Sequence, residues 1–215
     1  MTYTLDSART GLLNDVLGLD NDSDNRFGST TVRNLALQDG CRRLWPEMGL
    51  LLSETVTIVT GQLDYVLASV NDVTRVELTS SSVSTWYSDA GKDWSFWLDE
   101  DNGPTIRFPQ AFDPTLSLTV WGYTRYTVPA SGSDSFNLPD NQMYVVVDGA
   151  VSFLYRIEMN QFAAFQRHEN ENRRTALSSQ EMMALYRDAE GRYQAGKIAN
   201  RRRMVTPRRA VRIRP

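Results

Sequence analysis

The chain has 215 residues, of which 41% are hydrophobic and 23% charged, a composition typical of one folded domain or two small ones. No run approaches the ~18 consecutive apolar residues of a membrane span, and the first residues lack the pattern of a secretory signal. A single cysteine, Cys41, and a single histidine, His168, exclude an internal disulfide and leave few options for a metal site or a catalytic pair. We therefore expect a globular protein that does not insert into a membrane.

The net charge of −3 hides an asymmetry along the chain. Residues 1–100 carry 15 acidic and 7 basic side chains, residues 101–200 carry 11 and 9, and residues 201–215 carry seven arginines and no acid. Of the 23 basic residues, 21 are arginines, which favour bidentate contacts with carboxylates or phosphates. The sequence therefore predicts an acidic body and a basic tail that faces a partner.

The first fifty residues show two helical patterns separated by a polar turn. Apolar residues recur at helical spacing over residues 5–17, and Gly18 follows where a left-handed cap is favoured. After the turn, Ser29 or Thr30 can cap a second helix. This helix should end at Trp45, because the proline that follows disfavours helical geometry in the residue before it.

From residue 50 to residue 127 the pattern changes to short runs rich in β-branched and aromatic residues, which predicts a β-rich region. The clearest hairpin has Asn102 and Gly103 at its turn. Pro104 beside this turn favours an edge position or the first residue of a strand. The expected strands are residues 54–59, 63–68, 73–79, 84–88, 94–99, 104–108 and 116–125.

Two further helices are predicted after the β-rich region. Residues 129–134 form a Pro/Gly/Ser linker, and Pro139 with Asp140 introduces a strongly periodic apolar stretch that should be the central core helix. Ser178 and Glu181 have the spacing of a capping box that opens the last helix.

This order of elements predicts an α+β fold. We expect a four-helix body, a β-sheet insertion between the second and third helices, and an extended basic C-terminal arm. The expected segments are the first helical segment, the β-rich insertion, the second helical segment that completes the body, and the arm, at residues 1–49, 50–127, 128–200 and 201–215.

One acidic turn has part of the spacing of a calcium-binding loop. Asp20, Asp22 and Asp24 match its first three ligand positions. Asn25 and Thr31, however, stand where the loop needs its glycine and its bidentate glutamate. A solvated turn is the simpler interpretation.

Acidic residues and tryptophans around the predicted hairpin admit a second chemical interpretation, paired carboxylates on a sugar-binding platform. A solvated turn over a small aromatic core explains the same pattern more simply. The residues concerned are Asp93, Asp99, Glu100, Asp101, Trp86, Trp94 and Trp97.

Nothing else in the chain argues for catalysis. Cys41 is expected to be a small buried hydrophobe rather than an activated thiol, and His168 a solvated side chain. No phosphate-binding glycine loop or nucleophile elbow is recognisable. We therefore predict no enzyme activity, no catalytic residue, no metal site and no cofactor.

The arginine-rich tail calls for an acidic partner, either the phosphates of a nucleic acid or the carboxylates of a protein. Val211 and Ile213 alternate with Arg212 and Arg214, which is the period of a strand with one apolar and one charged face and favours docking to a protein. A disordered basic tail is the alternative. The predicted partner-binding residues are Arg201, Arg202, Arg203, Arg208, Arg209, Val211, Arg212, Ile213 and Arg214.

The order of several motifs carries a resemblance that spans most of the chain. These motifs are residues 13–17 before the acidic turn, Leu44-Trp45, residues 56–62 with Tyr65, Asn102-Gly103 leading to residues 106–109, residues 120–123, Leu138-Pro139-Asp140 with Ala150 and Tyr155, and the basic end. In this order the chain resembles the head-to-tail connector proteins of tailed bacteriophages, the adaptor family that includes the tail tubular protein A group.

The resemblance implies a structural virion protein without catalysis, made in the host cytoplasm and located at the head-tail junction. It implies a ring, usually of twelve copies, beneath the portal protein, with the β insertion facing outward or toward a tail or nozzle protein. The arm, Arg201 to Pro215, would reach the portal. Double-stranded DNA would pass through the ring during packaging and ejection, and an acidic lumen would repel its phosphates without sequence-specific binding.

Two other functions stay open on the residues alone. A nucleic-acid-binding protein would use the arginine tail on phosphates, and its affinity for DNA would depend steeply on salt. A carbohydrate-binding tail or baseplate component would use the tryptophan-rich sheet, and Trp94→Ala would abolish its glycan binding.

Overall fold

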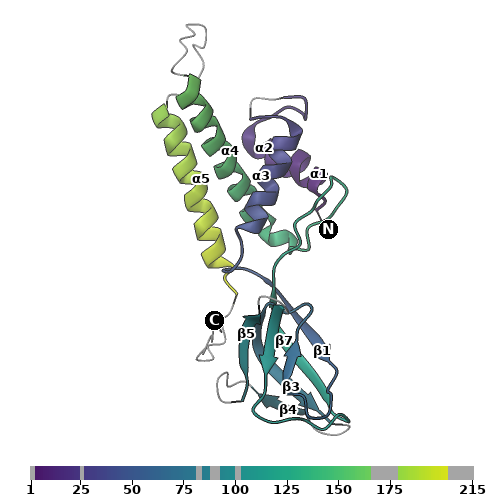
Figure 1. The fold of residues 1–215 in the computed structure, drawn as a ribbon. Helices are drawn as coiled ribbons and strands as arrows, with labels where there is room; N and C mark the ends of the chain where they lie inside the picture. Colours follow the sequence, from purple (N-terminus) through teal and green to yellow (C-terminus); the bar gives the residue numbers. More distant parts are fainter. Residues whose placement is uncertain are drawn as a thin grey trace. The chain divides into compact units, whose positions relative to one another are not determined.

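The structure is a computed structural model, and it describes residues 3–24, 27–80, 84–87, 93–99, 103–165 and 179–202. The chain divides into two compact units. The helical unit consists of Met1–Met48 and Tyr126–Arg201, and the β unit consists of Gly49–Arg125 and Arg202–Pro215 (Figure 1). Helices and antiparallel sheets occur together, which confirms the α+β class.

The first predicted helix is confirmed over residues 5–17, with one feature that its periodicity did not indicate. The run consists of α1 (Leu5–Ala8), η1 (Arg9–Leu13) and α2 (Asn14–Leu17), and η1 is a π-helical turn. Gly18 ends the run with a φ of 63°, the left-handed conformation that glycine adopts without strain.

The second helix, α3, spans Thr30–Arg42 and ends three residues before the predicted end at Trp45. Ser29 occupies the N-cap position. The chain leaves the helix through a tighter turn, in which the Leu44 amide donates to the carbonyl of Cys41 at 3.2 Å. Leu44 is buried there, so core packing ends the helix earlier than the proline rule predicts.

The prediction of a central core helix is confirmed. A short 3₁₀ turn, η2 (Asp140–Gln142), leads into α4 (Met143–Phe165), and α5 spans Ser179–Ala199. α4 contacts α5, α3 and η1, and in Figure 1 it runs between α5 and α3. Ser178, half of the predicted capping box, lies outside the described residues. The buried side chains of α4 are Met143, Val145, Val146, Val147, Ala150, Val151, Ser152 and Leu154.

Two glycines let α3, α4 and α5 approach one another closely. A Cβ at Gly40 would lie 2.5 Å from the carbonyl oxygen of Val146, and a Cβ at Gly149 would lie 2.8 Å from the ring of Tyr193. The Tyr193 hydroxyl donates to the Gly40 carbonyl at 3.1 Å. A side chain at either glycine would therefore force the helices apart.

The Pro/Gly/Ser segment expected as a linker is tied to the start of α1. The Leu5 amide donates to the carbonyl of Asp134 at 2.9 Å, and the Asp6 amide donates to that of Gly132 at 3.0 Å. Phe136, which follows, is buried. The segment is thus an integral part of the helical unit.

The β unit contains two antiparallel sheets, of strand order β1-β7-β3-β4 and β2-β6-β5 among the described residues. One apolar cluster takes side chains from both sheets, including Val76, Val120, Tyr65 and Ile106, so the sheets pack face to face. The strands are β1 (Leu50–Val56), β2 (Asp64–Val66), β3 (Asp72–Thr79), β4 (Ser84–Tyr87), β5 (Ser95–Asp99), β6 (Gly103–Arg107) and β7 (Ser117–Thr124).

Two details of the strand prediction are wrong. β1 starts and ends earlier than residues 54–59, because its pairing with β7 and not its local β propensity sets its ends. Pro104 lies in β6, the central strand of its sheet. The Leu67 amide still donates to the Pro104 carbonyl at 2.7 Å, but proline has no amide proton to return the bond, so the ladder between β2 and β6 ends there.

The predicted hairpin is confirmed as the pairing of β5 with β6. Gly103 stands opposite Asp99 and has a φ of 80°, which glycine supplies without strain. Asn102, the other predicted turn residue, lies outside the described residues.

Candidate partner-binding surfaces

The predicted binding residues fall into three groups. Arg201 is exposed at the end of the helical unit, and Arg202 is buried in the β unit. The other predicted residues lie outside the described part of the chain; they are Arg203, Arg208, Arg209, Val211, Arg212, Ile213 and Arg214.

Arg202 makes an ion pair inside the β unit. Its Nη1 lies 2.6 Å from Oδ2 of Asp72, and the two side chains are only 4% and 8% exposed. The guanidinium carbon also lies 5.5 Å from the centre of the Tyr123 ring, and Tyr123 pairs with Asp72 across β7 and β3. Removing one member of a buried ion pair leaves the other charge buried without its partner, which is strongly destabilising. Removing one member of an exposed pair costs little, because water solvates the remaining charge. The guanidinium of Arg202 is thus engaged within the chain.

The sequence did not single out Asp72 or Tyr123 as functional residues. One signal was present, the glycine inside the strand phrase Trp121-Gly122-Tyr123. A Cβ at Gly122 would lie 2.2 Å from the carbonyl oxygen of Asp72, so this glycine marks the close approach of two strands. A glycine in a strand cannot, however, reveal which distant side chain lies beside it.

Polar contacts hold the last turns of α5, from which the arm continues. Nζ of Lys197, a buried residue, lies 3.1 Å from Oε2 of Glu47. Burial raises the pKa of Glu47, but hydrogen bonds and nearby positive charges, those of Lys197 first, together outweigh it, and the pKa lies below its usual value. Nδ2 of Asn200 donates to the Tyr144 hydroxyl at 2.7 Å. The chain therefore leaves α5 from a fixed point of the helical unit.

A second ion pair joins α5 to the end of α3. Nη2 of Arg43 donates to both carboxylate oxygens of Glu190, at 2.6 and 2.7 Å. The guanidinium carbon of Arg43 lies 4.6 Å from the centre of the Tyr193 ring. Burial raises the pKa of Tyr193, so its hydroxyl stays protonated and can donate.

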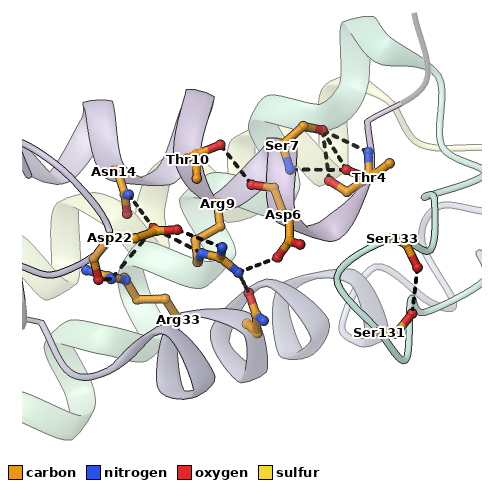
Figure 2. Close-up of polar contacts among 11 residues, drawn as sticks. Thr4, Asp6, Ser7, Arg9, Thr10, Asn14, Asp22, Arg33, Ser131 and Ser133 are labelled. Atoms are coloured by element: carbon orange, nitrogen blue, oxygen red, sulfur yellow. Dashed lines mark hydrogen bonds and ion pairs between the residues drawn. The ribbon is translucent and has the colours of Figure 1, made fainter.

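The acidic turn after α2 is partly exposed, as a solvated turn is, and two arginines also hold it (Figure 2). Nη2 of Arg9 donates to Oδ2 of Asp22 at 2.7 Å, and its Nη1 donates to Asp6 at 2.6 Å. Arg33 is fully buried and donates to the backbone carbonyls of Asp22 and Asp24 at 2.8 and 2.6 Å. The hydrogen bond from Arg9 lowers the pKa of Asp22. This carboxylate is therefore committed to arginine.

The sugar-platform hypothesis needs a correction at Trp94. This side chain is buried in the apolar cluster of the β unit, and its Nε1 donates to the carbonyl of Tyr87 at 3.2 Å. It cannot stack on a sugar without unfolding the core. Trp97 is partly exposed, with the guanidinium of Arg107 5.6 Å from its ring centre. Glu100 and Asp101, and the side chains of Trp86 and Asp99, lie outside the described part.

The prediction for Cys41 is confirmed. The thiol is buried, and burial raises its pKa to about 12, so the reactive thiolate is not formed near neutral pH. His168 lies outside the described residues. Within the described ranges, no three histidine, cysteine or carboxylate side chains converge as a metal site requires. Nor does any helix there combine the length and apolar character needed to cross a bilayer.

α5 presents an outward stripe that its own subunit leaves open. Ala184, Gly191 and Ile198 are exposed and follow at intervals of seven residues, so they lie on one face of the helix. Ile198 is 72% exposed. A Cβ at Gly191 would meet no atom within 4 Å, in contrast to Gly40 and Gly149. Nothing described in the subunit requires a glycine at this position.

The opposite outer elements of the helical unit show similar features. Gly11 in η1 is exposed, and a Cβ there would also meet nothing within 4 Å. Val16 in α2 is 56% exposed and Leu35 in α3 is 48% exposed. The helical unit thus carries exposed apolar side chains on α5 and also on α2 and α3, with an exposed glycine in η1.

Comparisons with known proteins add little to this geometry. No family model matches the chain, and no curated protein matches it. One solved structure that matches is described as "Neck of empty GTA particle computed with C6 symmetry". It is 14% identical, covers 88% of this chain and 94% of its own, and has a TM-score of 0.31. A TM-score of this size does not establish a shared fold, and we base the function on the chain's own residues.

Proposed function

We propose that this chain is a structural virion protein, a head-to-tail adaptor whose copies close into a ring beneath a portal protein. The ring joins the capsid to the tail or nozzle protein and surrounds the path of double-stranded DNA. In this proposal the helices form the ring body, the β unit is an insertion between α3 and α4, and residues 203–215 continue as a basic arm onto the portal. The family that the chain resembles suggests twelve copies.

The observation that carries the proposal is the pair of outward glycines. A glycine inside a helix costs ~1 kcal/mol relative to alanine. Gly40 and Gly149 repay this cost inside the subunit, because they let helices cross closely. Gly191 and Gly11 have no such role among the described residues, since a Cβ at either would meet open space. Close packing of a neighbouring copy against these positions would explain why each is a glycine.

The two surfaces also have the relation that a ring requires. A head-to-tail interface joins unlike surfaces of successive copies and closes into a ring when the rotation allows it. In this proposal the α5 stripe is one surface, and Gly11, Val16 and Leu35 belong to the other. Copies that paired only α5 with α5 would stop at a dimer.

The charge distribution suits the remaining parts of the proposal. Residues 1–200 carry an excess of acids, and an acidic lumen would repel phosphates and let DNA pass. The arm carries arginines without acids, which suits a carboxylate-rich surface on the portal.

A bulky side chain at Gly191 tests the ring. In Gly191→Trp the added side chain meets open space around the subunit, so the helical unit should keep its circular dichroism, and the isolated subunit should be no less stable than in wild type. Gln110→Trp places the same bulk at an exposed position of the β unit and is the matched control. Sedimentation velocity and negative-stain images should show rings for wild type and for the control, and single subunits for Gly191→Trp. Intact rings in Gly191→Trp would remove α5 from the interface.

A second variant tests how the arm binds. Replacing Val211 and Ile213 by serine leaves the charge unchanged, so purely electrostatic binding should barely change. Two buried aliphatic side chains are worth roughly 1.5–3 kcal/mol each, so docking to purified portal rings should weaken by at least about tenfold even at low salt. Equal affinity, together with a steep salt dependence of DNA binding, would instead favour a nucleic-acid-binding protein.

A further inference from the structure

The first two residues of the predicted arm belong to different units. α5 ends at Ala199, Arg201 belongs to the helical unit, and Arg202 belongs to the β unit. Of the two tail arginines that the structure describes, Arg202 is buried against a carboxylate and Arg201 is exposed. By composition alone, all seven arginines were equivalent partner contacts. The structure separates Arg202 from Arg201.

The place that receives Arg202 is shaped by the backbone. β3 shifts register between Val73 and Arg75, as a bulge does, and Asp72 stands at the start of the strand, before this irregularity. Gly122 lets β7 approach the backbone of Asp72 to a distance that a Cβ would prevent. Tyr123 then offers its ring to the guanidinium while Asp72 offers its carboxylate. The Asp72 carboxylate and the Tyr123 ring, on two closely spaced strands, thus both contact the guanidinium of Arg202.

We propose that Arg202 is a positioning residue, which forms with Asp72 and Tyr123 an arm latch that fixes where the arm leaves the β unit. The arm latch holds the first residue of the arm, so that the following arginines meet an acidic protein surface with less freedom to lose on binding. This role rests on the proposed docking of the arm to a portal protein. Arg202 acts through the arm and makes no contact with the partner itself.

The arm latch and a direct partner contact predict opposite effects of Asp72→Asn. If Arg202 bound the partner, Asp72→Asn would release its guanidinium, and affinity would stay equal or rise. If Arg202 positions the arm, Asp72→Asn should weaken docking as much as Arg202→Gln does. Both substitutions break the same contact. The double variant should therefore bind portal rings with about the same affinity as whichever single variant binds less tightly.

The binding test uses the full chain and purified portal rings. Wild type, Asp72→Asn, Arg202→Gln and the double variant are compared, with Arg187→Gln as the control that removes one exposed positive charge from α5. The three latch variants should bind roughly three- to tenfold more weakly than the control. Affinity of Asp72→Asn at or above that of the control overturns the proposal. Melting curves identify any variant that has lost its fold. If Asp72→Asn or Arg202→Gln has done so, the trypsin test described next, applied to wild type and Tyr123→Leu, decides whether the arm latch exists.

A partner-free test keeps the arm latch separate from the proposed function. Trypsin must take the Arg202 side chain into its own specificity pocket to cleave after it, so the latch should slow this cleavage. Cleavage after Arg203 is the internal reference, measured by mass spectrometry of early products. Asp72→Asn, or Tyr123→Leu, should raise cleavage after Arg202 relative to the reference by about tenfold or more. An unchanged ratio overturns the arm latch, whereas a raised ratio in a protein that does not bind portal rings supports it and rejects the proposed docking.

Discussion

The two units of the chain bury charge in different ways. In the helical unit, Arg9, Arg33 and Lys197 are buried, and each faces a carboxylate or a backbone carbonyl. The core of the β unit is an apolar cluster, and the buried pair of Arg202 with Asp72 lies at the start of β3. The packing of the helices therefore depends on particular polar partners, whereas the packing of the sheets depends mainly on apolar alternation.

A charge placed where the helical unit has no partner for it should give the largest effect. Ala150 is fully buried on α4, so Ala150→Asp places an unpaired carboxylate among apolar side chains. We expect the free energy of unfolding of the helical unit to fall by about 4 kcal/mol. Urea unfolding followed by circular dichroism measures it, with Ala150→Ser as the smaller polar control. A loss below about 1 kcal/mol in Ala150→Asp would remove Ala150 from the core.

Two truncations test the buried pair of the β unit. The sequence predicts that residues 1–200 fold alone, since truncation removes no predicted core residue. The structure shows that this chain would lack Arg202 and leave Asp72 buried without it. We expect residues 1–202 to unfold like the full chain, and residues 1–200 to be less stable by about 2–3 kcal/mol. Tryptophan fluorescence in urea follows mainly the β unit, which holds four of the five tryptophans. Identical curves for the two truncations would show that the pair adds no stability.

The sequence predicted the local pattern well and the distant partners poorly. Helical periodicity and β-branched runs are local, so residues 5–17, the core face of α4 and the hairpin before Gly103 were found. The end of α3 and the ends of β1 were missed, because packing and strand pairing set them. Periodicity carries no information on which acid meets which arginine.

The candidate site shows the same limit. Arg202 and Asp72 are 130 residues apart in the chain, and nothing local distinguishes Arg202 from Arg201. The role proposed for Arg202 follows from its contact with Asp72 on β3, which only the folded structure reveals. The acidic turn was likewise found by its composition, but the arginine that organises it, Arg33, lies on the next helix.

The arginine-bound turn of the helical unit should give a smaller, pH-dependent effect. Asp22 has a pKa below its ordinary value of 3.8, because Arg9 donates to it. Its contribution is therefore complete above the unfolded pKa and is lost as the pH falls through the lower folded pKa. We expect Asp22→Asn to cost about 1–2 kcal/mol at pH 7, since the carboxylate is partly exposed.

The pH series supplies the control for this variant. The difference between wild type and Asp22→Asn should be constant between pH 5 and 7, as both pKa values lie lower, and should shrink as the pH falls below about 3.8. Asp20→Asn, at an exposed position of the same turn, should change little at either pH. A difference that persists undiminished at the lowest pH would assign the effect to side-chain shape rather than charge.

The smallest effect should have the opposite sign. Gly191→Ala fills open space on α5 and removes the conformational cost of a helical glycine, so the isolated subunit should gain about 0.5–1 kcal/mol of stability. Gly40→Ala is the matched variant in α3, and there the added Cβ would lie 2.5 Å from the Val146 carbonyl, so stability should fall. Thermal unfolding at protein concentrations below ring assembly measures both. If ring assembly weakens in Gly191→Ala while the subunit becomes more stable, the glycine serves the neighbouring copy and not its own helix; a destabilised subunit would instead mean that Gly191 is needed inside it.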